Sequence, residues 1–107
     1  MTTDITDNPI TFSKQQLAFF RKLYLAYLID TESHNLLSLV ATTGMPRRTI
    51  QDCLKVLKDV GIDCVFVDTA GTRHNDGFYQ IRTWGAINQQ WVADNIVMIK
   101  TGLGLPS

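Results

Sequence analysis

The sequence predicts an α+β fold that is mainly helical, with three helices, then a β-hairpin, then a fourth helix. Apolar residues recur three and four positions apart in residues 13–30, 36–43 and 47–61, which is the spacing of one face of an α-helix. After Gly61 the apolar spacing changes to two, and β-branched and aromatic residues become frequent, which indicates β-strands. Polar and glycine-rich residues between two such strands indicate a hairpin turn.

The composition predicts one soluble domain. The chain has 107 residues, an apolar fraction of 45% and a charged fraction of 19%, which are ordinary for a globular protein. We expect a single domain over residues 1–107, with a core of 13–83 and a helical extension of 84–107. No apolar run is long enough to span a bilayer, and the polar N-terminus is no signal peptide. Two cysteines are too few for a disulfide scaffold, so we expect a cytoplasmic protein without membrane contact.

The first helix is expected to begin at Ser13 and to run to about Asp30. Ser13 and Gln16 have the spacing of a capping box, in which each side chain accepts a hydrogen bond from the backbone N–H of the other residue. Residues Leu23–Ile29 carry no charge, and a helix that is apolar on all sides must be covered on all sides. We expect either a homodimer interface on this segment or coverage by the C-terminal helix.

A short helix at Leu36–Thr43 should end at Gly44, because glycine readily adopts the left-handed conformation of a helix end. Pro46 has a fixed φ and no N–H, which suits the start of the next helix. This third helix is expected to begin at Arg47 and to end at Gly61. Its inner face consists of Ile50, Cys53, Leu54 and Leu57. A short helix that follows a tight turn and carries arginines in its first turn is typical of major-groove binding.

Two strands and one more helix should follow. The strands are expected at Ile62–Asp68 and Gly77–Thr83, with a turn at Thr69–Asp76 between them. A fourth helix is expected from Asn88 to about Lys100, stopped by Gly102. Its apolar positions are Trp91, Val92, Ile96 and Ile99.

Residues Thr43 to Gly61 carry the pattern T-G-M-P-R-R-T-I-Q-x-x-L-K-x-L-x-x-V-G. This pattern resembles the recognition helix of bacterial winged helix-turn-helix regulators of the MarR and IclR types, and the chain is similar to small prokaryotic winged-helix proteins. The resemblance covers about Ser13 to Thr83 and implies a winged helix-turn-helix fold, in which the hairpin is the wing. It implies binding of double-stranded DNA in transcription regulation. It also implies a homodimer built from the Leu23–Ile29 segment, the C-terminal helix or both.

The candidate DNA-binding residues lie on the third helix and at the wing tip; they are Arg47, Arg48, Thr49, Gln51, Asp52, Lys55, Lys58, Arg73 and His74. An arginine can donate two hydrogen bonds to guanine or hold a phosphate, and a glutamine can pair with adenine. Lys55 would hold a phosphate unless it pairs with Asp52 or Asp59. Asp52 repels phosphate unless it accepts a hydrogen bond from a cytosine amino group. The alternative is a solvated surface and, for Arg73, a hairpin tip without a contact.

The net charge of zero is unusual for a nucleic-acid-binding domain. It supports a second hypothesis, in which the fold is a protein–protein interaction module that does not bind DNA. The two hypotheses differ in salt dependence, because phosphate binding weakens steeply with ionic strength and an apolar contact does not.

Catalysis, cofactor binding and metal binding are not expected. The sequence has no catalytic or nucleotide-binding motif, so we expect neither enzymatic activity nor a cofactor. The residues that could bind a metal or sense redox state are Cys53, Cys64, His34 and His74, but their spacing matches no metal motif. Cys53 is expected to be a small core residue.

Overall fold

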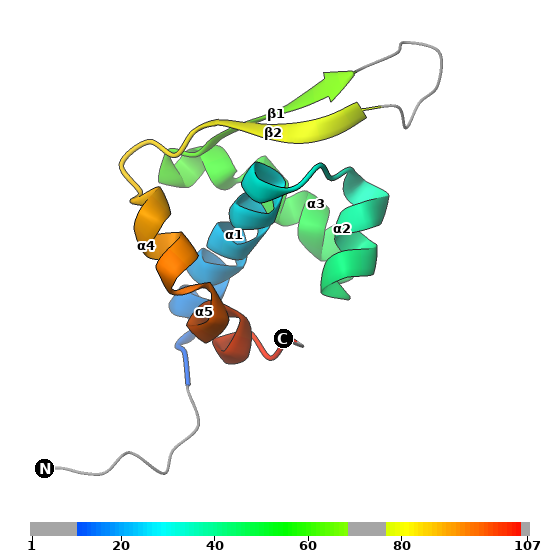
Figure 1. Ribbon diagram of the computed structural model, residues 1–107. Helices are drawn as coiled ribbons and strands as arrows, with labels where there is room; N and C mark the ends of the chain where they lie inside the picture. The colour runs from blue at the N-terminus through cyan, green and yellow to red at the C-terminus, as the bar shows by residue number, and fades with distance from the viewer. Residues whose placement is uncertain (1–10, 69–76, 106–107) are drawn as a thin grey trace, which may run out of the picture.

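The computed structural model describes residues 11–68 and 77–105. They form the helices α1 (Lys14–Thr31), α2 (Leu36–Thr43), α3 (Arg47–Lys55), α4 (Gln89–Asp94) and α5 (Ile96–Gly102), the 3-10 helix η2 (Leu57–Val60), and the strands β1 (Asp63–Asp68) and β2 (Gly77–Thr83). This order confirms the predicted α+β, mainly helical class. Figure 1 shows α1 in the middle, α2 and α3 on one side of it, α4 and α5 on the other, and the hairpin across one end. None of the described helices is long and apolar enough to cross a membrane.

The predicted capping box opens α1. The Ser13 hydroxyl accepts a hydrogen bond from the Gln16 backbone N–H at 3.1 Å, and the Gln16 side-chain oxygen accepts one from the Ser13 N–H at 2.9 Å. Both bonds satisfy N–H groups that have no partner within the helix itself. The helix ends at Thr31, one residue beyond the expected end.

The uncharged segment Leu23–Ile29 of α1 is covered within one chain. All of its residues are buried except Tyr27, which is half-buried. The helix packs against α3, β2, α4 and α5, and Val92 of α4 and Ile99 of α5 are themselves completely buried. The prediction of a homodimer interface on Leu23–Ile29 is therefore wrong. Its alternative, coverage by the C-terminal helices, is confirmed, because the apolar surface finds its partners inside the monomer.

The third helix is shorter than expected. Its α-helical part ends at Lys55, and Leu57–Val60 form η2 before Gly61 adopts a φ of 87°. The prediction of one helix from Arg47 to Gly61 is therefore wrong over its last turn. A 3-10 turn is frequent at the end of an α-helix, and here it accompanies the complete burial of Leu57.

The C-terminal segment forms two helices rather than the single helix expected from Asn88 to Lys100. The Asn88 side chain caps α4 by accepting a hydrogen bond from the Trp91 N–H at 3.1 Å. The break lies at Asn95, whose side-chain amide donates to the Trp91 carbonyl oxygen at 2.8 Å. An asparagine that bonds the backbone in this way competes with helix continuation. The last helix, α5, ends at Gly102, two residues beyond the expected end at about Lys100.

The two strands pair antiparallel, with Cys64 opposite Ile81 and Phe66 opposite Tyr79. Both strands agree with their expected bounds to within one residue. Ile81 is buried, so the strand face that carries it adjoins the helical core. The turn expected at residues 69–76 lies outside the described residues.

Just after β2, the backbone at Gly85 lies close to the backbone at Gly61. Gly85 has a φ of 61°, and a Cβ atom added to it would overlap the Gly61 carbonyl oxygen. Gly104 has a similar φ of 75°, but a Cβ atom there would meet no other atom within 4 Å.

We predict that Gly85→Ala lowers the free energy of unfolding by about 2 kcal/mol or more, because the overlap adds to the cost of a left-handed alanine. Gly104→Ala is the matched control and should cost about 1 kcal/mol, the conformational part alone. Denaturant titration of both variants measures the difference. Equal losses would contradict a structural role for the close approach.

Candidate nucleic-acid interface

The turn between α2 and α3 determines where α3 begins. Gly44 ends α2 with a φ of 73°, as predicted, and Met45 is buried. The buried Thr43 hydroxyl donates to the Leu39 carbonyl oxygen at 2.7 Å and accepts from the Met45 N–H at 3.0 Å. Because these contacts hold the turn from its inner side, α3 leaves it in a defined direction.

The N-terminus of α3 has no side-chain cap. Pro46 occupies the cap position with a φ of −58°, and Arg47 is the first helical residue, as predicted. Within the described residues, no side chain therefore caps the backbone N–H groups of the first turn. These groups and the helix dipole both favour a negative charge at this end.

The predicted outer face of α3 is confirmed as exposed surface. Its exposed residues are Arg47, Arg48, Gln51, Asp52 and Lys55, and Lys58 of η2 is exposed as well. Thr49 is half-buried, so it is the least accessible of the candidates on this helix. On the inner face, Ile50 and Cys53 are buried, whereas Leu54 is only half-buried.

The charges of this face are only weakly paired. The Arg48 Nε atom lies 4.0 Å from a carboxylate oxygen of Asp52, and the two side chains are 90% and 64% exposed. Such an exposed pair contributes about 0.2–0.5 kcal/mol. No ion pair within residues 11–68 and 77–105 involves Lys55, so the alternative pairing with Asp52 or Asp59 is not formed. The surface keeps an excess of positive charge.

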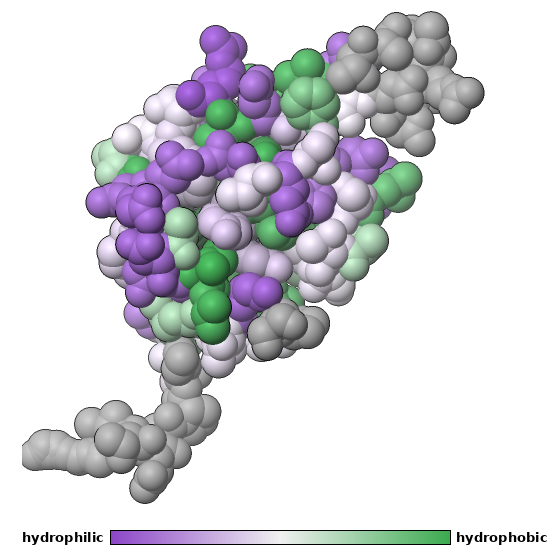
Figure 2. Space-filling model, viewed as in Figure 1, coloured by the Kyte–Doolittle hydropathy of each residue, from purple (hydrophilic) through white to green (hydrophobic). Residues whose placement is uncertain are grey.

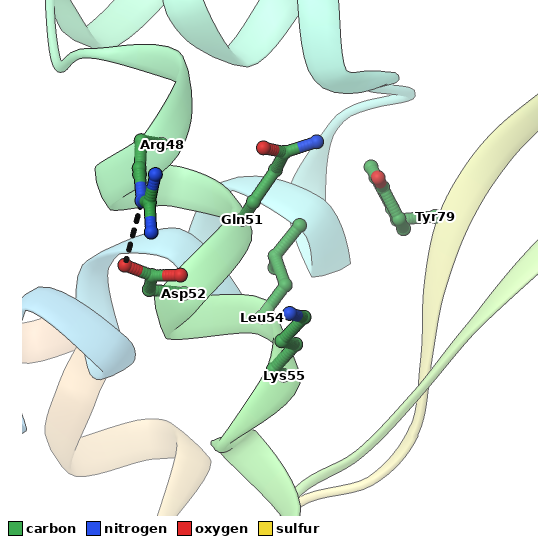
Figure 3. A pocket seen from close by; sticks show the side chains of 6 residues that line it. All are labelled: Arg48, Gln51, Asp52, Leu54, Lys55 and Tyr79. Atoms are coloured by element: carbon green, nitrogen blue, oxygen red, sulfur yellow. Dashed lines mark ion pairs between the residues drawn. The ribbon is translucent and has the colours of Figure 1, made fainter.

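A groove of about 450 Å³ lies between α3 and β2. Its lining residues are Arg48, Gln51, Asp52, Leu54 and Lys55 of α3 and Tyr79 of β2. Figure 3 shows Gln51 and Leu54 on the side of α3 that is nearer to Tyr79, with Arg48 and Asp52 on the other side. Two cations, one carboxylate and one amide therefore share the groove with a phenol.

Tyr79 was predicted only as a strand residue, and its place in the groove was missed. Its backbone N–H donates to the His34 carbonyl oxygen at 2.8 Å, which attaches β2 to the loop before α2. Burial raises the pKa of the Tyr79 phenol, Cys64 raises it further, and Arg47 opposes both effects. The phenol therefore keeps its proton at neutral pH and can donate it to a hydrogen bond. The available sequence signal was strand alternation, which puts Tyr79 on the same face as Ile81.

The described part of the wing offers little free positive charge. Arg82 of β2 lies across the hairpin from Asp63, with 3.8 Å between its Nε atom and the carboxylate. The two residues expected near the wing tip, Arg73 and His74, lie outside the described residues, so their contacts with DNA stay a prediction.

The residues considered for metal or redox sensing are not clustered where the structure describes them. Cys53 is a buried core residue, as expected, and Cys64 is half-buried; both are free thiols. The buried His34 has its Nδ1 atom 2.8 Å from the Ser38 hydroxyl and its Nε2 atom 2.6 Å from a Glu32 carboxylate oxygen. Among residues 11–68 and 77–105 there is no group of three or more His, Cys, Asp or Glu residues that could hold a metal ion.

A three-helix arrangement with an exposed third helix and a following hairpin defines the winged helix-turn-helix class. The sequence model of the family described as winged helix-turn helix matches residues 14–103, so the chain belongs to this family. Among solved structures, the chain is similar to a DUF2131 family protein from Shewanella amazonensis, with 50% identity and a TM-score of 0.83. The match covers 89% of this chain and 91% of that protein. No curated protein matches the sequence.

We predict that Cys64 makes the protein less stable at alkaline pH. Burial, together with the Asp63 carboxylate, raises the pKa of the Cys64 thiol from 9.0 to about 11. The unfolded chain loses this proton at a lower pH than the folded chain, so the free energy of unfolding falls as the pH rises from about 9 towards 11. Urea titrations across this range should show a shallower decline for Cys64→Ala. An unchanged slope would contradict the assignment.

Proposed function

We propose that this protein binds double-stranded DNA with α3 in the major groove and that it regulates transcription. The observation that carries the proposal is the uncapped start of α3, where Arg47 and Arg48 stand beside the exposed Gln51 and Lys55. In a member of the winged helix-turn-helix family, such a helix combines anion-binding N–H groups with side chains that can contact base edges.

The roles follow from the chemistry of each side chain. Arg47 and Arg48 donate hydrogen bonds to guanine or to phosphate, and Gln51 pairs with adenine. The remaining contacts on this side come from Thr49, Asp52, Lys55 and Lys58, of which the lysines hold phosphates and Asp52 accepts from a cytosine amino group. At the wing tip, Arg73 and His74 contact the backbone or the minor groove.

The proposed DNA-binding form is a homodimer in the cytoplasm, where the free Cys53 and Cys64 remain reduced. Two copies double the number of phosphate contacts, which compensates for a net charge of zero. The surface proposed for the dimer lies on α4 and α5, where Trp91 is 44% and Val97 is 66% exposed. Figure 2 shows a small hydrophobic patch near α5, next to hydrophilic residues over α4.

The same exposed apolar side chains favour the second candidate, a protein–protein interaction module without DNA binding. That module would hold its partner at high ionic strength, whereas phosphate contacts are lost there. Titrating a labelled duplex at low and at moderate salt separates the two functions. Binding that falls steeply with salt supports the DNA reader, and no binding even at low salt favours the protein module.

We predict that replacing Arg47 and Arg48 together by alanine lowers the affinity for the cognate duplex by about tenfold or more at moderate salt, because base and phosphate contacts are lost. Fluorescence anisotropy with a labelled duplex measures the change. The matched control replaces Lys14 and Lys22 of α1 by alanine, which removes the same charge outside α3 and outside the proposed dimer surface. If both double variants weakened binding equally, the effect would come from the net charge of the protein, and the proposed contacts of α3 would be contradicted.

We predict that Val97→Glu converts the dimer into a monomer, since a carboxylate would be buried without a partner at the interface. Val97 is 66% exposed in the single chain, so the fold should tolerate the change. Leu37→Glu on α2, where Leu37 is 59% exposed, is the control and should leave the dimer intact. Light scattering gives the mass in each case. A monomeric wild-type protein at micromolar concentration would rule out this dimer.

A further inference from the structure

An aromatic pair lies on the β2 side of the groove: the half-buried Tyr79 lines it, and the exposed Phe66 lies next to Tyr79, just outside the lining. Phe66 of β1 lies opposite Tyr79 of β2, with ring centroids 5.1 Å apart and ring planes inclined at 73°. Strand alternation puts both on the hairpin face that carries the buried Ile81. Phe66 is 46% exposed, although a hydrophobic core begins two residue positions away on this face. The pair, called the aromatic wall below, therefore continues the apolar face beyond the core.

The Phe66 ring and the Tyr79 backbone each have a restraining contact. The Phe66 ring lies over Gly77, where its Cε2 and Cζ atoms would be 2.6 Å from any added Cβ atom. The backbone of Tyr79 is fixed by the hydrogen bond from its N–H to the His34 carbonyl oxygen. A ring that is ordered before binding loses little side-chain entropy when a ligand stacks on it.

The opposite side of the groove is polar. Gln51 presents an amide, which can both donate and accept, and Lys55 presents an ammonium group. A groove with Tyr79 on one side, Phe66 next to it, and a cation with an amide on the other side is suited to a flat heterocycle joined to a phosphate. Its volume of about 450 Å³ lies within the range of sites that bind small ligands.

We propose that the groove between α3 and the aromatic wall binds an unpaired base of DNA. A paired base presents only its edge, whereas a base that has left the helical stack presents the flat surface that aromatic rings bind. In this complex the base stacks on the Phe66 ring and meets Tyr79 edge-on, because the two ring planes are inclined at 73°. Gln51 bonds the polar edge of the base, and Lys55 holds the adjacent phosphate. The inference rests on the proposed DNA binding and adds a preference for DNA with a locally opened base pair.

The test compares two labelled duplexes that differ only by one extra, unpaired adenine in one strand. Anisotropy titrations at moderate salt should give about tenfold tighter binding to the duplex with the unpaired base, as expected for one stacked base. Phe66→Leu keeps an apolar side chain but removes the ring, so it should abolish this preference without weakening binding to the paired duplex. Tyr79→Phe keeps the ring and should keep most of the preference.

The control variant is Phe19→Leu, the same change at a phenylalanine of α1 that is 37% exposed and contacts Phe20 rather than Tyr79. It should bind both duplexes as the wild type does.

Equal wild-type affinities for the two duplexes, or a preference that survives in Phe66→Leu, would overturn the inference and leave DNA binding intact. Displacement of the DNA by micromolar adenosine monophosphate would also overturn it, because the occupant would then be a free nucleotide. If neither duplex binds at low salt, the proposed function itself fails.

Discussion

The structure depends on the need to bury the segment Leu23–Ile29 of α1. Between Leu23 and Ile29 this helix has no charge, so water is an unfavourable neighbour in every direction. The chain covers it with α3, β2, α4 and α5, each of which packs on the same helix. The C-terminal helices therefore complete the core, and Val92 and Ile99 are as fully buried as any residue of the three-helix unit. Since α3 and the hairpin share this support, the groove between them has a fixed shape.

Features coded by adjacent residues were predictable from the sequence, and features that depend on packing were not. The capping box at Ser13, the end of α2 at Gly44 and the start of α3 after Pro46 each follow from side chains within a few positions. The 3-10 turn at Leu57 has no such local code, because it accompanies burial of a side chain in the core. The break at Asn95 coincides with a hydrogen bond from its side-chain amide to the Trp91 carbonyl oxygen. The spacing of apolar residues, from which the helix was predicted, carries no information about such a bond.

The candidate site divides in the same way. Helical geometry alone was enough to predict which residues of α3 face outward, because they share one element. The contribution of Tyr79 was missed because it comes from another element, whose position relative to α3 follows from tertiary contacts. One of these contacts is the hydrogen bond from the Tyr79 N–H to the His34 carbonyl, between residues 45 positions apart in the chain. The role of Phe66 was missed for the same reason. Its position opposite Tyr79 follows from the strand register, and its exposure follows from the packing of the hairpin on the helices.

A protein with a net charge of zero could still bind DNA if it combined two kinds of contact, ionic contacts to phosphates and stacking on the aromatic wall. The proposed phosphate contacts from Arg47, Lys55 and Lys58 would release counterions, so their contribution would fall as salt rises. The weak pairing of Arg48 with Asp52 removes part of this contribution even at low salt. Stacking on Phe66 involves no charge and releases no counterion, so it persists at moderate ionic strength. A nearly neutral protein with both surfaces would therefore lose non-specific affinity with rising salt while it keeps the affinity that depends on an opened base.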